Sequence, residues 1–178
     1  IWNTLLYTIG QRCAIDRGYP FGVNHAILFW TFLLLLIANA EFLLHGLAPD
    51  YISLARLPNG AHYTLAFVFD LASILALLAV CAAVIRRLAF PPKYMVARSR
   101  DAFTILGLIV FLMVAFFGTH ASEIAQGIEE AESYMPISSW VASTFMAGAS
   151  ARTLTWLANF FWWVHAIVLL GFLNYLPY

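Results

Sequence analysis

Five histidines stand in or beside long apolar runs of this sequence. Placing an imidazole side chain in a membrane costs free energy, so each histidine there is a candidate functional residue. His165 stands two residues after the aromatic run 160–163, and His25 stands at the start of another apolar stretch. Neutral imidazole is the usual protein ligand of haem iron, and the core of a helix bundle flanked by aromatic side chains can hold a porphyrin. We therefore identify His165 and His25 as the leading candidate haem ligands. The alternative for each is a histidine hydrogen-bonded to a neighbouring helix.

The spacing of the other histidines suggests how ligands could pair. His25 and His45 are 20 residues apart, which in a helix is about 30 Å, so they lie at opposite membrane faces. If His45 and His165 stand at equal depth in antiparallel helices, their numbers sum to 210 and a partner for His25 falls near position 185. His25 and His45 are however about 160° apart around a helix. His120 is a rival partner for His165, and His62 reads as interfacial.

Two carboxylates also stand within apolar stretches. An Asp, Lys or Arg there costs about 2.5 to 3.5 kcal/mol on insertion scales, so each one is a candidate functional group. Asp70 and Glu41 could deliver protons to a quinone or hydrogen-bond a ligand imidazole, or each could be a neutral acid bonded to a neighbouring helix. Arg152 is expected near the outer membrane face, as Asp70 is, and is a further candidate at a quinone site.

The elements that position these residues are predicted to be membrane-spanning helices. Of the 178 residues 63% are hydrophobic and 10% are charged, and the mean hydropathy is +0.84. Four stretches approach or exceed the roughly 20 apolar residues that span a bilayer. They cover residues 21–47, 61–85, 102–119 and 156–178. They are too long and too uniformly apolar for barrel strands, so we predict an all-α transmembrane bundle of about four helices.

Charge and cysteine placement limit the classes of function. The nine basic and nine acidic residues give no net charge, so nucleic acid is not an expected partner. Seven of the nine basic residues precede the first stretch or follow the second, which predicts that both ends of the chain face the cytoplasm. The acidic connection 121–155 is expected to contain a helix at the membrane surface. Cys13 and Cys81 form no Cys-x-x-Cys pair, which excludes a c-type haem attachment and an iron–sulfur cluster held by this chain alone.

Two segments carry a resemblance to known families. The segment HAIVLLGFLNYLPY, residues 165–178, resembles the last membrane helix of the respiratory nitrate reductase gamma subunit. In that family a ligand histidine precedes a Pro-aromatic pair by twelve residues, and a second ligand, which would fall near position 183, follows the proline by six. The segment NHAILFW, residues 24–30, looks closer to membrane domains of heterodisulfide-reductase-type iron–sulfur oxidoreductases, including those linking electron-transfer flavoprotein to menaquinone. The resemblance covers nearly the whole chain.

The sequence departs from the nitrate reductase pattern in one respect. That family takes two ligands about ten residues apart from one helix, whereas Leu35 stands ten residues after His25, and Asn39 rather than a histidine follows. The resemblance implies His25 and His165 as ligands of haem iron, and the depth comparison adds His45, with His120 as the rival ligand of His165. It leaves the second ligand of the haem at the outer face open.

The resulting expectation is a membrane di-haem cytochrome b domain over residues 1–178, a fragment with a preceding helix and a following cytoplasmic iron–sulfur domain outside it. Its two haem b groups would pass electrons between a cytoplasmic iron–sulfur or flavin partner, such as electron-transfer flavoprotein, and quinone or menaquinone in the cell inner membrane. A 4Fe-4S cluster would belong to the missing domain or a partner. The chain would thus be the membrane part of a quinone-linked oxidoreductase. The alternative is a redox-inactive membrane anchor or transporter subunit whose histidines line a proton or substrate path.

Overall fold

The computed structural model describes residues 5–17, 19–48, 54–91, 99–128 and 134–175, and these residues form helices without a strand. In chain order the elements are η1 (Leu5–Ile9), α2 (Arg12–Arg17), α3 (Phe21–Leu47), η2 (Leu54–Arg56), α4 (Asn59–Ala89), α5 (Arg100–Ala125), α6 (Pro136–Phe145) and α7 (Ala151–Tyr175). Four of them, α3, α4, α5 and α7, are long and apolar enough to cross a membrane. The prediction of an all-α transmembrane bundle is confirmed.

The helix bounds agree with the apolar stretches at α3 and differ elsewhere. The stretch 102–119 underestimates α5, which continues to Ala125, so His120 lies inside the helix rather than at its end. The extension is polar, but a helix keeps its backbone groups bonded, and the Ser122 hydroxyl donates to the Gly118 carbonyl at 2.7 Å. The stretch 156–178 begins five residues too late, because α7 starts at Ala151. Its last three residues lie outside the described part of the chain.

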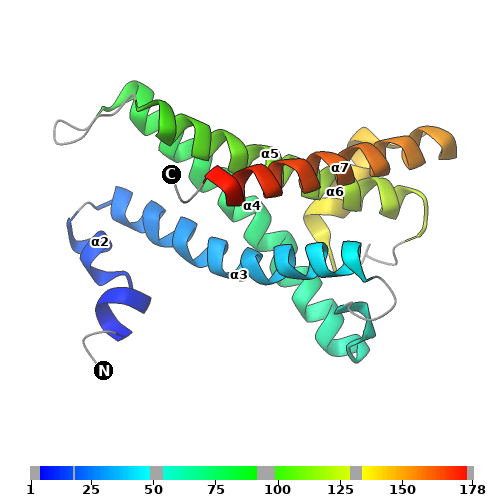
Figure 1. Cartoon of the computed structure of the whole chain (residues 1–178), viewed down its shortest axis with the longest axis horizontal. Helices are drawn as coiled ribbons and strands as arrows, with labels where there is room; N and C mark the ends of the chain where they lie inside the picture. The colour runs from blue at the N-terminus through cyan, green and yellow to red at the C-terminus, as the bar shows by residue number, and fades with distance from the viewer. Residues whose placement is uncertain (1–4, 18, 49–53, 92–98, 129–133, 176–178) are drawn as a thin grey trace.

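The four long helices alternate in direction and form two packed pairs. α3 packs along α4 and α5 packs along α7, and the pairs join where α4 meets α5. Figure 1 shows that the start of α3, the end of α4, the start of α5 and the end of α7 all lie toward one end of the bundle. We call this the basic end, after Arg86, Arg87 and Arg100. The opposite end, which carries α6, is called the α6 end.

α6 confirms the helix predicted in the connection between the last two spans. It is a ten-residue helix with Ser138 and Ala142 buried, while Trp140 and Phe145 are 59% and 71% exposed. Tryptophan is typical of the membrane–water interface, so these side chains fit a helix at the membrane surface. The acidic residues of the connection at 129, 130 and 132 lie outside the described residues.

Two hydrophobic clusters hold the bundle together. One lies toward the α6 end and includes Phe69, Phe116, Phe117 and Met135. The other lies nearer the middle of the bundle, where Leu35 of α3 and Leu169 of α7 meet α4 and α5. α3 contributes little to either cluster, since only three of its residues are buried. Most of α3 therefore faces outward, as expected for a helix in lipid.

Candidate functional site: a histidine-lined cavity

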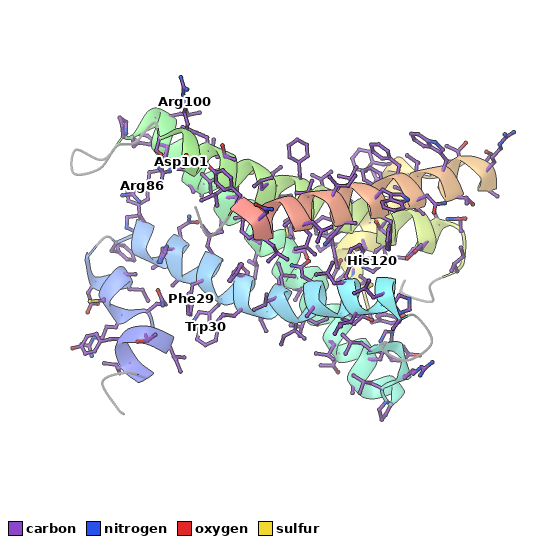
Figure 2. The ribbon with its side chains drawn as sticks, in the orientation of Figure 1. Phe29, Trp30, Arg86, Arg100, Asp101 and His120 are labelled. Carbon is purple, nitrogen blue, oxygen red and sulfur yellow. The ribbon has the colours of Figure 1, made fainter. Side chains whose placement is uncertain are left out.

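A cavity of about 330 Å³ lies between α3, α4, α5 and α7 toward the α6 end. Four of the five histidines line it: His45, His62, His120 and His165. Figure 2 shows His120 in the space between α5 and the last turns of α3. Aromatic side chains form much of the remaining wall: Phe42, Phe69, Phe116 and Trp162. Its volume falls within the range of small-molecule and cofactor sites, which are typically apolar with a few placed polar groups.

α3 presents one face to this cavity. Ala38, Asn39, Phe42 and His45 all line it, at spacings of three and four residues that place them along one side of a helix. His25, twenty residues earlier, lies about 30 Å away near the basic end, and its side chain is exposed. The structure thus separates His25 from the other four histidines, as the spacing predicted.

His165 is the most enclosed of these histidines, with a relative exposure of 6%. Its Nε2 lies 2.9 Å from Oδ1 of Asn39 on α3, so the imidazole donates this hydrogen bond when Nε2 carries the proton. Its ring centroid is 4.5 Å from that of Phe42, also on α3. Both contacts reach across the space between the two helix pairs. Asn39, noted in the sequence only as a position without a histidine, is therefore part of the site.

Side-chain contacts fix the depth of α3 against α7. Five contacts between described residues bridge the two helices: Phe32 with Phe172, Asn39 with His165, Phe42 with both Trp162 and His165, and Gly46 with Trp162. In these pairs the two residue numbers add up to between 204 and 208, whereas His45 and His165 add up to 210. His45 therefore lies about 3–9 Å nearer the α6 end than the residue opposite His165. These contacts do not place His45 and His165 at equal depth, because the register of two helices depends on their packing rather than on either sequence.

Contacts between α5 and α7 give the depth of His120 in the same way. Three contacts bridge α5 and α7: Asp101 with Tyr175, Gly118 with Phe161, and Gln126 with Thr155. In these pairs the residue numbers add up to between 276 and 281, so position 159 of α7 stands opposite His120. In the α3 register, positions 159–163 of α7 stand opposite His45. His45 and His120 thus lie at similar levels, and His165 lies deeper.

Helix direction brings the three histidines back together. In an α-helix each Cα–Cβ bond tilts toward the amino end of the helix. α3 and α5 run from the basic end to the α6 end, so His45 and His120 lean toward the bundle interior. α7 runs the other way, and His165 leans toward the α6 end. The three imidazoles therefore converge on the cavity despite their different levels.

Packing distinguishes the two partners available to His165. α5 and α7 are in direct contact, and a methyl group added at Gly118 would overlap the ring of Phe161. α3 and α7 meet instead through long side chains such as Phe42 and Trp162, whose ring centroids are 5.2 Å apart. α5 and α7 therefore pack closely along their backbones, whereas α3 and α7 are joined only through such side chains among the described residues.

The three quinone or proton candidates lie in different surroundings. Asp70 is fully buried but does not line the cavity, and its carboxyl group accepts hydrogen bonds from the start of α6. Glu41 does line the cavity, and its Oε1 accepts a 3.1 Å hydrogen bond from the Leu54 amide. Arg152 is exposed in the first turn of α7, away from the cavity. The structure brings only Glu41 to the site.

Two further polar residues at the cavity were not predicted as site residues: Thr119 and Glu123 line it from the last turns of α5. His62, which was expected to be interfacial, lines it from α4. Within the described residues, Oγ1 of Thr119 is buried without a hydrogen-bond partner. A polar group of a molecule bound in the cavity would satisfy this hydroxyl. Among the described residues no cluster of three or more His, Cys, Asp or Glu is arranged to hold a metal ion alone.

The comparisons with known proteins give one relative. No family model matches the sequence, and no solved structure matches it. The chain is 24% identical over 187 aligned positions to the EtfAB:quinone oxidoreductase of Syntrophomonas wolfei subsp. wolfei. The alignment covers the whole of this chain and 25% of that protein. This similarity agrees with the resemblance to quinone-linked oxidoreductases, while the resemblance to the nitrate reductase gamma subunit stays a prediction.

Proposed function

We propose that this chain is the membrane part of a quinone-linked oxidoreductase and carries electrons through b-type haem. The observation that supports this most is the convergence of His45, His120 and His165 on one cavity inside a transmembrane helix bundle. The similarity to a protein named as a quinone oxidoreductase supports the same class of function. Because the chain spans a quarter of that protein, the flavoprotein donor, the iron–sulfur partner and the quinone are all part of the proposal.

The residues of the cavity fit a haem. Histidine side chains line it from α3, α4, α5 and α7, and aromatic rings supply flat apolar walls. The Thr119 hydroxyl at the same wall lacks a partner within the described residues. When bound, the haem would supply one-electron redox chemistry, and the chain would set its ligation and its exclusion from water.

Each histidine has a proposed role. His165 and His45 would hold the haem iron, because both line the cavity from helices that are joined through side chains rather than packed closely. Asn39 would then release Nε2 of His165, since iron and the amide compete for the same nitrogen. His120 and His62 would lie at the edge of the site. A second haem bound by His25 near the basic end remains a separate proposal.

The two ends of the bundle would serve the two electron partners. The basic end, with Arg86, Arg87 and Arg100, is the face that the positive-inside rule places in the cytoplasm, where an iron–sulfur or flavin partner would dock. Quinone would reach the cavity from the bilayer near the α6 end. Glu41 and His62 are the groups at the cavity best suited to exchange protons with it.

Histidine substitutions test the ligand assignment. Removing an axial ligand leaves one face of the iron empty, so His165→Ala and His45→Ala should each abolish the same low-spin haem signal. His120→Ala should spare that signal, and His25→Ala, about 30 Å away, is the matched control. Electron paramagnetic resonance and redox titration of membranes would report the result. Loss of the signal in His120→Ala with an unchanged signal in His45→Ala would move the site to α5 and α7.

A further inference from the structure

Asp70 makes a set of contacts that electron transfer through haem does not require. Its side chain, on α4, is fully buried. Oδ2 accepts a 2.7 Å hydrogen bond from the Ile137 amide, and Oδ1 accepts from both the amide and the hydroxyl of Ser138, at 3.1 and 2.6 Å. Both carboxyl oxygens are therefore committed to α6, 67 and 68 residues further along the chain.

α6 depends on this distant carboxyl group. The first amides of a helix have no partner within it, and α6 begins with Pro136, which has no amide hydrogen to satisfy. Met135 at the N-cap position makes no side-chain cap hydrogen bond. Asp70 bonds the next two amides, at Ile137 and Ser138, and so performs from α4 the capping that the local sequence lacks. A carboxylate at this end is also favoured by the helix dipole.

The residues that Asp70 holds in place cover the histidine-lined cavity. Met135 directly precedes α6, is 1% exposed and lines the cavity. The ring of Tyr134 stacks on Tyr63 of α4 at 4.4 Å and lies 6.1 Å from the ring of His62, another cavity residue. Met135 thus forms part of the cavity wall, and the rest of segment 134–138 joins it to α6, which exposes Trp140.

We propose that Asp70 is a positioning residue that holds segment 134–138 against the cavity and keeps water from the membrane surface out of it. Asp70 then acts through Met135 and α6 rather than by exchanging protons with quinone. The exclusion of water from the cavity by Asp70 is inferred from these contacts and does not depend on the proposed function. Its consequence for the redox potential of a haem rests on the proposed function.

Thiol labelling tests the seal without any haem. The exposed Cys13 and Cys81 are first replaced by Ser and Ala, and Met135→Cys then supplies one buried thiol. A membrane-impermeant maleimide should label this thiol at least about tenfold faster when Asp70→Ala is added, which corresponds to about 1.4 kcal/mol of easier local opening. Asp70→Asn, which keeps one acceptor oxygen, should give an intermediate rate.

Two further variants keep the test decisive. Asn24→Ala is the matched control, because it removes the 3.0 Å hydrogen bond from Asn24 to the Ala79 carbonyl, which joins α3 to α4 away from the cavity. It should leave the labelling rate unchanged. If Asp70→Ala does not fold, Ser138→Ala removes one of the three bonds and should raise the rate by a smaller factor. Labelling of Asp70→Asn and Ser138→Ala at the parental rate would overturn the proposal.

A second readout separates this role from simple stabilisation. Water entering a haem site favours the charged ferric form, so Asp70→Asn should lower the midpoint potential of the haem near His165, while Asn24→Ala should not. An unchanged potential together with an unchanged labelling rate would reject the role of Asp70 and leave the proposed function standing. If Asp70→Ala is labelled faster but the parent protein binds no haem when haem is supplied, the role of Asp70 is supported and the proposed function is rejected.

Discussion

Replacing Asn39 by leucine should change the stability of the haem-free protein and of the haem-bound protein by different amounts. In the present structure Asn39 Oδ1 is bonded to Nε2 of His165 at 2.9 Å across the gap between α3 and α7. Leucine keeps the branched shape and the number of non-hydrogen atoms of asparagine and removes the acceptor. If iron takes the same nitrogen when haem binds, the bond to Asn39 exists only in the haem-free protein. Asn39→Leu should therefore destabilise the haem-free form and leave the haem-bound form nearly unchanged.

The size of the effect follows from the surroundings of the bond. A buried imidazole that loses its partner in a soluble protein costs about 1–3 kcal/mol. Hydrogen bonds between membrane helices average about 0.6 kcal/mol and reach about 1.7 kcal/mol, and this range applies because both residues lie within membrane-spanning helices. By thermodynamic linkage the lost stability of the haem-free form reappears as tighter haem binding. Asn39→Leu should bind haem about threefold to fifteenfold more tightly.

The assay is a haem titration of the haem-depleted protein in detergent, followed by absorbance, with thermal unfolding of both forms. Thr31→Val is the matched control on the same helix. The Thr31 hydroxyl bonds only the carbonyls of Ile27 and Leu28 in its own helix, so its loss should affect both forms equally. Weaker haem binding in Asn39→Leu would show that Asn39 supports the bound state, and the competition between iron and the amide would be refuted.

Two further substitutions test the packing around the site. Gly118→Ala places a methyl group where the ring of Phe161 lies, so it should lower the free energy of unfolding by about 1–3 kcal/mol and lower the unfolding temperature. Gly107→Ala on the same helix is the control, because its methyl group meets nothing within 4 Å and should not destabilise the protein. Glu41→Ala removes the acceptor of the Leu54 amide and should speed hydrogen exchange at that amide, which Glu41→Gln, keeping an oxygen, should largely restore. Equal melting of the two glycine variants, or unchanged exchange in Glu41→Ala, would contradict the corresponding contact.

The sequence predicted the spans because lipid imposes a simple composition rule. Pro20 and Pro49 flank the first apolar stretch, and α3 has the bounds expected from it. The end of α5 was missed because Ser122 and Glu123 are polar, although a helix tolerates polar residues once it turns toward a cavity or a membrane surface. Hydropathy reports where a helix is apolar, and it does not report where its hydrogen bonding stops.

The sequence predicted the site from its histidines, and it predicted their arrangement only in part. Four of the five histidines line one cavity, while their role as haem ligands stays a prediction. Which side chain faces His165 depends on the register of α3 against α7, a property of the packed bundle, so Asn39 rather than His45 occupies that position. The role of Asp70 was equally hidden, because its partners stand 67 and 68 residues away in a helix whose own sequence shows no capping residue.

The most direct test of electron transfer through haem is the absorption spectrum of the purified protein, produced in haem-replete cells. Dithionite should give the sharp alpha bands of low-spin b-type haem with two imidazole ligands, and a menaquinol analogue should reduce the haem that we assign to His165 and His45. Both responses of this haem should disappear in His165→Ala, while the bands of a second haem at His25 would persist. A colourless protein, or haem bands that are all unchanged in His165→Ala, would contradict the account.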